Sequence, residues 1–381
     1  MKNVTTLPDR RLVLLTLLLV GLGMIMVYAS SSYRASMAGV TEFSFAARQT
    51  LRALIGLSVM FLLAWIPYRV SCRFALIALP AAVLMLLITV VGTSFTRSSY
   101  GITRWLHIFG VIVQPVELVK LGLALGLPYW IDRHPEVTRD GKAFLRMAAV
   151  PGIAILLLAL QPNFGSAMAL ALLCLSLFWL GGVKARWIFL LLLAGAVLCW
   201  LAYAHVGKVH ERVAAWMNLL LRGGHDGRFG YQSYQALVGL GSGGWRGVGP
   251  GMSTMKYLFL PASHTDFIFA ILGEELGFVG AGGLVIILFF WFARTLKVAR
   301  NAPDGLAYLV TLSIGAMVLC YAVLNLAVVV GLMPVTGLPL PFLSYGGSAL
   351  ITNLAGVGVL LSVTRHLRRR RAPNDRWRKR A

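Results

Sequence analysis

Acidic residues at the entrance of a long apolar run are the clearest candidates for chemistry in this sequence. The stretch from Pro261 to Gly277 reads PASHTDFIFAILGEELG, with Asp266 near its start and Glu274 and Glu275 further in. As one continuous helix it would place Glu274 roughly 12 Å beyond Asp266, at about 1.5 Å per residue. A carboxylate in apolar surroundings is costly unless it has a partner or water. We therefore predict that the functional site lies near the mouth of this helix.

Each of these acids also has a structural explanation. An acid in the first turn of a helix is favoured by the macrodipole, and Thr265 could be the N-cap of that helix. His264, the buried acids and the glycine-rich segment upstream favour a functional role for Asp266 instead. At about 100° per residue, Glu274 lies roughly 80° around the helix from Asp266, and Glu275 lies near the opposite side. We assign Glu274 to the cavity and Glu275 to structural pairing.

A second acid lies in another apolar segment, next to a base. Glu117 and Lys120 follow Gln114 and Pro115 and are three residues apart, so they share one face of a helix. They could form an ion pair that only braces a bundle. They could equally line a polar cavity, because ionisable residues inside a membrane are functional candidates by default.

The composition indicates a polytopic membrane protein. The chain of 381 residues is 58% hydrophobic and 13% charged, with a mean hydropathy of +0.78, whereas a soluble domain carries about 25% charged residues. The net charge of +22 comes mainly from short turns and the C-terminal tail, where membrane topology and anionic lipid explain it better than nucleic acid does. The four cysteines are far apart and predict packing residues, not a disulfide framework.

Ten apolar segments are long enough to span a bilayer, since about 20 residues are needed. They predict an all-α membrane domain over residues 1–364, with ten transmembrane helices and a large extracytoplasmic loop, 205–264, between the seventh and eighth. Residues 365–381 would form a basic cytoplasmic tail on anionic lipid. The ten segments are 12–29, 50–66, 74–92, 114–131, 146–161, 164–181, 187–204, 265–293, 306–332 and 348–364.

The positive-inside rule predicts that both termini are cytoplasmic. Four unusual segments then lie outside: 94–115, 161–165, 205–264 and the Pro- and Gly-rich 334–348. Any chemistry is therefore expected on the outer face. Cations there are suited to a diphosphate, although each could be solvated surface, and hydroxyls of the last segment could line a polar groove. The candidates for substrate binding are Arg104, Arg212, Lys256 and Ser344.

Five stretches of the chain, in this order, resemble the SEDS (shape, elongation, division and sporulation) family, which comprises the RodA, FtsW and SpoVE proteins of bacterial wall synthesis. The resemblance covers nearly all of the helical part. The stretches are GITRWLHIFGVIVQPVELVKL, LQPNFGSA, GYQSYQALVGLGSGGWRGVGPG, LPASHTDFIFAILGEELGFVG and VVGLMPVTGLPLPFLSYGGSALITNL.

This resemblance implies a ten-helix peptidoglycan glycosyltransferase of the bacterial cytoplasmic membrane. It implies lipid II (undecaprenyl-linked disaccharide-pentapeptide) as substrate and a class B penicillin-binding protein as partner, in elongation or division. The family's catalytic Asp falls on Asp266, and its conserved Glu and Lys fall on Glu117 and Lys120. Asp266 would be the general base of an inverting transfer. Arg104, Arg212, Lys256 or a divalent cation (Mg or Mn) would offset the charge of the leaving diphosphate.

The chain departs from the family pattern at four positions. Asn163 and Ala262 replace acids of the outer face, which puts in doubt any cation site built from those acids. Val116 and Ala349 each replace a serine.

Two other functions fit the same residues. A lipid II flippase would need a polar path to the inner face, whereas the polar and glycine-rich segments of this chain gather outside. A non-catalytic scaffold for the wall-synthesis complex gives no reason for acids inside the membrane.

Overall fold

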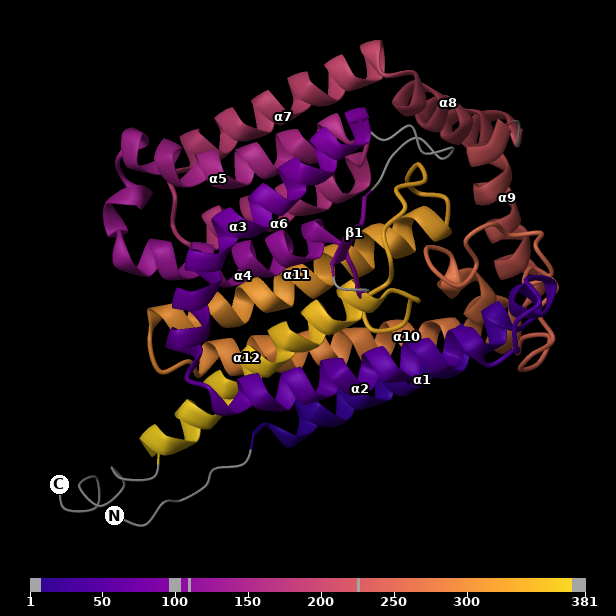
Figure 1. The fold of residues 1–381 in the computed structure, drawn as a ribbon, viewed down its shortest axis with the longest axis horizontal. Helices are drawn as coiled ribbons and strands as arrows, with labels where there is room; N and C mark the ends of the chain where they lie inside the picture. Colours follow the sequence, from indigo (N-terminus) through magenta and orange to yellow (C-terminus); the bar gives the residue numbers. More distant parts are fainter. Residues whose placement is uncertain (1–7, 96–103, 109–110, 225–226, 372–381) are drawn as a thin grey trace.

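The computed structural model describes residues 8–95, 104–108, 111–224 and 227–371, and most of this part is helical (Figure 1). One short 3-10 helix, η1 (Pro135–Thr138), follows α4. The α-helices of the described part are α1 (Arg10–Met37), α2 (Ser44–Trp65), α3 (Tyr68–Phe95), α4 (Pro115–Arg133), α5 (Gly141–Leu160), α6 (Phe164–Leu180), α7 (Ala185–His205), α8 (Gly207–Arg222), α9 (Gly227–Ser242), α10 (Ile268–Arg300), α11 (Gly305–Val329) and α12 (Gly347–Arg371).

Eight of these helices are long and apolar enough to cross a membrane: α1, α2, α3, α5, α7, α10, α11 and α12. The other two predicted spans coincide with α4 and α6. Helix α6 has 17 residues, and α4 carries charged residues at both ends. The prediction of an all-α polytopic membrane protein is thus confirmed, and the number of ten spans stays a prediction.

The segments between spans contain structure that the sequence analysis did not anticipate. Residues 205–264 include helices α8 and α9, which lie together at one end of the molecule (Figure 1). Two short antiparallel strands, β1 (Leu106–Ile108) and β2 (Val111–Val113), precede α4, with Leu106 opposite Val113.

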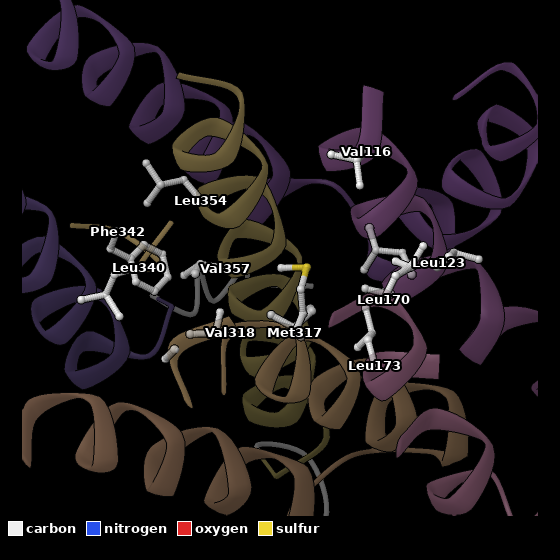
Figure 2. Packing of buried hydrophobic residues seen from close by; sticks show 14 of the residues in the cluster. Val116, Leu123, Leu170, Leu173, Met317, Val318, Leu340, Phe342, Leu354 and Val357 are labelled. Atoms are coloured by element: carbon white, nitrogen blue, oxygen red, sulfur yellow. The ribbon is translucent and has the colours of Figure 1, made fainter. Parts of the chain in front are cut away.

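The core is a contiguous apolar cluster to which most of the helices contribute, and Figure 2 shows Leu123, Leu170, Met317 and Leu354 of α4, α6, α11 and α12 within it. Side chains of this size fill the space between the helices at high density. Through this core α4 and α11 lie side by side.

Helices α2 and α12 approach each other closely at glycines. A Cβ added at Gly358 would lie 2.5 Å from the carbonyl oxygen of Met60, and one at Gly56 would lie 2.6 Å from a methyl of Leu354. Small residues are typical of such crossings, because they let helix backbones pack tightly in a membrane.

Helix α10 is broken at Gly277, whose φ of 65° and ψ of −166° are not helical. Segment 243–249 lies against the break: Val248 N donates to Glu274 O at 3.0 Å, and Phe278 N donates to Gly244 O at 2.8 Å. A Cβ at Gly247 would collide with the carbonyl of Glu275. Backbone-to-backbone contact therefore connects the segment after α9 to the N-terminal part of α10.

The opposite end of the bundle is held by ion pairs. Asp9 accepts hydrogen bonds from Arg11 N and Leu12 N at 3.1 Å as the N-cap of α1, and its Oδ2 lies 2.5 Å from Nη2 of Arg294 on α10. Its own backbone N–H donates to Thr364 Oγ1 on α12 at 3.1 Å. The beginning of α1 and the final turns of α10 and α12 therefore lie at the same end.

We predict that Gly358→Ala lowers the free energy of unfolding by about 1–3 kcal/mol, the usual cost of overpacking, because its Cβ meets backbone of α2 that cannot rotate away. Gly21→Ala in α1 is the matched control, since a Cβ there has nothing within 4 Å and should stabilise slightly. Thermal unfolding of the purified protein in detergent measures both. Equal midpoints for the two variants would contradict the close crossing.

Candidate functional site

Asp266 lies in an irregular turn immediately before α10, which begins at Ile268 with Phe267 at its N-cap position and no side chain capping it. The expectation that Thr265 caps the helix is therefore wrong: its hydroxyl donates to Ala262 O at 3.2 Å. Since Asp266 is not helical, the angular relation predicted between Asp266 and Glu274 does not apply either. The position of the Asp266 side chain is therefore set by the turn of residues 261–267 and not by a continuous helix.

The turn is held by the Pro- and Gly-rich segment that precedes α12. Ser344 Oγ donates to Thr265 O at 2.6 Å and accepts from Leu340 N at 2.8 Å, and Tyr345 N donates to His264 O at 3.0 Å. Ser344 is buried, and its hydroxyl is occupied by the bonds to Thr265 O and Leu340 N. The structure thus places Ser344 against the turn, where it fixes the backbone immediately before Asp266.

Asn325 of α11 gives a second support that the sequence analysis missed. Its Nδ2 donates at 2.7 Å both to Asp266 O and to Leu338 O. The signal was present in the sequence as a lone amide inside the apolar run 306–332, where a polar side chain needs partners. Asn325 therefore fastens the Asp266 turn to the segment 334–346.

Gly337 leaves space beside the carboxylate. It has a φ of 76°, a conformation that favours glycine, and a Cβ there would lie 3.6 Å from Asp266 Oδ2. Asp266 itself is only partly buried. Because Gly337 has no side chain, no Cβ of this residue contacts the Asp266 carboxylate.

Two of the predicted cations, Arg104 and Arg212, lie near Asp266. Arg104 Nη2 donates to Pro162 O at 3.0 Å, and Arg212 Nη1, from α8, donates to Val335 O at 3.2 Å. These carbonyls belong to two of the outer segments predicted from sequence. Carbonyl bonds orient the guanidiniums without neutralising them, so both positive charges remain available to a ligand.

Loss of water is the main cause of the pKa shifts of Asp266, Arg104 and Arg212. Desolvation raises the pKa of Asp266 to about 6, against the lowering effect of the Thr265 hydrogen bond and of the Arg104 and Arg212 charges. Desolvation also lowers the pKa of both arginines, partly offset by Asp266. A carboxylate with a pKa near 6 is mostly ionised at neutral pH and more basic than an ordinary Asp.

Glu117 and Lys120 form a buried ion pair on α4, with Nζ 2.5 Å from Oε2. Thr352 Oγ1 donates to Glu117 Oε2 at 3.1 Å, and Lys120 Nζ donates to Asn353 Oδ1 at 3.3 Å. The ammonium also lies 4.3 Å from the ring centroid of Tyr321 on α11. The pair is therefore braced by α12 and α11 on two sides.

Helix α11 relates this ion pair to Asp266. Tyr321, which contacts Lys120, and Asn325, which contacts Asp266, are four residues apart, or roughly 6 Å along the helix. The pair consequently lies about one turn deeper in the bundle than the Asp266 turn. The structure brings Asp266, Arg104 and Arg212 together and places Glu117 and Lys120 beneath them.

Glu274 and Lys256 lie in another part of the structure. Glu274 accepts from Thr254 N at 2.9 Å, Thr254 Oγ1 at 2.7 Å, Met255 N at 3.3 Å and the hydroxyl of Ser253. Lys256 donates to Gly251 O. Both side chains are buried. The bonds of Glu274 hold residues 253–255 against α10, and the bond of Lys256 closes the segment 251–256 on itself.

His264 is buried between two aromatic rings. Its ring centroid lies 5.6 Å from those of Phe45 and Tyr345. Burial, with the charge of Arg34 as a smaller cause, lowers the pKa of His264 to about 4, so the imidazole is neutral at pH 7. Within the described residues its Nδ1 has no hydrogen-bond partner.

The described residues contain no group of three or more His, Cys, Asp or Glu side chains that could hold a metal ion. Asn163, where the resembled family has an acid, is buried at the N-terminus of α6. The divalent cation stays a prediction, and the positive charge that the described residues provide near Asp266 comes from Arg104 and Arg212.

The helices and this site define a polytopic membrane protein with an acid–guanidinium site in a turn before one of its spans. Residues 10–369 match the FtsW/RodA/SpoVE family, described as cell cycle proteins. The chain belongs to this family. It is 35% identical over 374 residues to the stage V sporulation protein E of Bacillus subtilis, with 95% of this chain and 98% of the relative covered.

Further relatives agree. A probable peptidoglycan glycosyltransferase FtsW of Geobacter sp. (strain M18) is 32% identical, with 94% of this chain and 97% of the relative covered. Among solved structures, a chain of a peptidoglycan synthase complex that coordinates polymerization and crosslinking has a TM-score of 0.74, 30% identity and coverages of 94% and 98%. The rod shape determining protein RodA of Thermus thermophilus has a TM-score of 0.67 at 27% identity, with coverages of 94% and 97%.

The buried pair yields a stability prediction. Glu117→Gln or Lys120→Met alone should lower the free energy of unfolding by about 3–5 kcal/mol, because each leaves an uncompensated buried charge. The double substitution should cost clearly less than the sum of the two. A double-mutant cycle on unfolding in detergent measures this coupling. Glu136→Gln, which breaks the exposed contact with His134, is the control and should change stability little.

Proposed function

We propose that this chain is a peptidoglycan glycosyltransferase that polymerises lipid II into glycan strands on the outer face of the cytoplasmic membrane, in cell elongation or division. The observation that carries the proposal is Asp266, a partly buried residue whose carboxyl has a raised pKa and interacts with the charges of two guanidiniums. Its relatives include probable peptidoglycan glycosyltransferases that match over almost their whole length.

In the proposed reaction Asp266 is the general base. The sugar hydroxyl at C4 of the acceptor attacks the anomeric carbon of the donor, and its proton passes to the Asp266 carboxylate. The new glycosidic bond forms as the bond between the anomeric carbon and the lipid diphosphate breaks, with inversion at that carbon. A general base of this kind typically contributes 10²–10⁴-fold to the rate.

Arg104 and Arg212 are assigned to the leaving diphosphate. Negative charge grows on its oxygens as the bond breaks, and guanidiniums held by carbonyl oxygens can receive it without reorganising. Glu117 and Lys120 form the polar floor beneath the substrate, while His264, Ser344, Glu274 and Lys256 support the outer segments around it.

The topology proposed for this function places both termini in the cytoplasm and Asp266 outside. The distribution of Lys and Arg supports it, as does the common end shared by the first turn of α1 and the end of α12. A class B penicillin-binding protein is the proposed partner, and the similarity to a chain of a peptidoglycan synthase complex supports that assignment.

Replacing the base tests the proposal directly. Asp266→Asn retains the size and removes the carboxylate, and should reduce lipid II polymerisation by at least about a hundredfold. The assay uses the purified protein with its transpeptidase partner and counts glycan strands on gels. Glu136→Gln, an exposed acid in η1, should leave polymerisation unchanged.

Strands made equally by wild type and Asp266→Asn would remove Asp266 from the mechanism. No strands from wild type, together with movement of lipid II across vesicles, would identify a flippase instead.

The pH profile gives an independent test. Since the ionised carboxylate is the active form, kcat/KM should be half-maximal near pH 6, reach its plateau above that value and decline as the pH falls below it. Arg212→Gln removes a charge that lowers the pKa of Asp266, so the acid limb should move to higher pH. Arg139→Gln, an exposed cation beside η1, should leave the limb in place. An acid limb that stays put in Arg212→Gln would contradict the electrostatic coupling.

A further inference from the structure

A groove between α8 and α9 lies outside the site already described. Its volume is about 860 Å³, and it opens to the surface. Residues that line it include Lys208, Glu211 and Arg222 from α8 and Arg228 and Phe229 from α9. This volume lies in the range of small-ligand sites, roughly 300–1,000 Å³, so a few residues of peptide or a sugar would fit.

The groove has an excess of positive charge. Among the described residues that line it, Lys208, Arg222 and Arg228 are opposed by one acid, Glu211. None of these four residues has an ion-pair partner within 4 Å among the residues that the structure describes. Unpaired cations around an open cavity attract an anionic ligand, and guanidiniums bind carboxylates through paired hydrogen bonds.

The groove is joined to the Asp266 site by one side chain. The ring of Phe229, in the groove wall, lies 4.7 Å from the guanidinium carbon of Arg212. Arg212 in turn donates to Val335 O and acts electrostatically on Asp266. Trp216 Nε1, one turn further along α8, donates to Gly331 O at 2.9 Å. One face of α8 therefore packs on residues 331–335, while the adjacent face lines the groove.

The lining is mixed, which suits a peptide better than a bare phosphate. Ala214, Met217 and Leu221 give it apolar surface between the charges. A peptide presents apolar side chains and, at its C-terminus, a free carboxylate. A molecule that is being joined at Asp266 and carries such a peptide could place the peptide in this groove.

We propose that the groove between α8 and α9 is a subsite for the carboxylate-bearing peptide of the glycan substrate, with Arg222 and Arg228 as its anion ligands. The inference rests on the proposed function, since it takes lipid II as the molecule held at Asp266. It makes α8 and α9 a specificity element: the enzyme would distinguish substrates by the charge of their peptide.

The experiment uses the full-length protein with its partner and two synthetic lipid II substrates that differ only in whether the peptide carboxylates are free or amidated. Wild type should show a KM about three- to tenfold lower for the free form. The double variant Arg222→Gln/Arg228→Gln should lose that preference with kcat largely unchanged. Glu211→Gln should strengthen the preference, because it removes the opposing charge, and such a gain cannot come from damage to the fold.

Arg34→Gln is the matched control, an exposed arginine outside the groove, and should retain the wild-type preference. Equal KM values for both substrates in wild type, with strands still made, would overturn the subsite and leave the proposed function intact. A preference that survives in Arg222→Gln/Arg228→Gln, or that Arg34→Gln abolishes equally, would also overturn it. No strands from wild type with either substrate would instead overturn the proposed function, and the subsite with it.

Discussion

The cost of keeping a carboxylate among apolar helices shapes this structure more than any other constraint. Glu117 is paired with Lys120, Asp9 is paired with Arg294, and Glu274 accepts hydrogen bonds from segment 253–255. Asp266 differs from these three acids, because the described part of the chain gives its carboxylate neither an ion-pair partner within 4 Å nor a backbone hydrogen bond. The paired and hydrogen-bonded acids hold the fold together, whereas desolvation raises the pKa of the Asp266 carboxyl.

The site depends on irregular backbone that is fixed by side chains. Asn325 and Ser344 donate to the carbonyls of Asp266 and Thr265, so the turn cannot rotate without breaking bonds that are largely protected from water. Irregular backbone near a membrane is tolerated only where protein or water satisfies its polar groups. These hydrogen bonds therefore satisfy polar groups of the turn and fix the backbone that carries the Asp266 carboxylate.

Glycine has a comparable role at the break in α10. At Gly277 the helix changes direction, and its backbone bonds to the segment 243–249. Glu274 and Glu275 contribute their carbonyls to that contact, and Glu274 also anchors the residues that follow. From sequence we expected Glu274 to line a cavity and Glu275 to be structurally paired. In the structure Glu274 mainly attaches the segment after α9 to α10.

The sequence by itself determined the class of the molecule and its principal residues. Hydropathy located the long apolar helices, since it depends on composition over about 20 residues, and spacing along a helix predicted that Glu117 and Lys120 would meet. Tertiary structure alone decided how Asp266 is held. Asn325, Ser344 and Gly337 reach it from distant parts of the chain, and α10 begins after Asp266 rather than before it. Local pattern carries no information on such contacts, because they arise only when α11 and the segment before α12 pack against the turn.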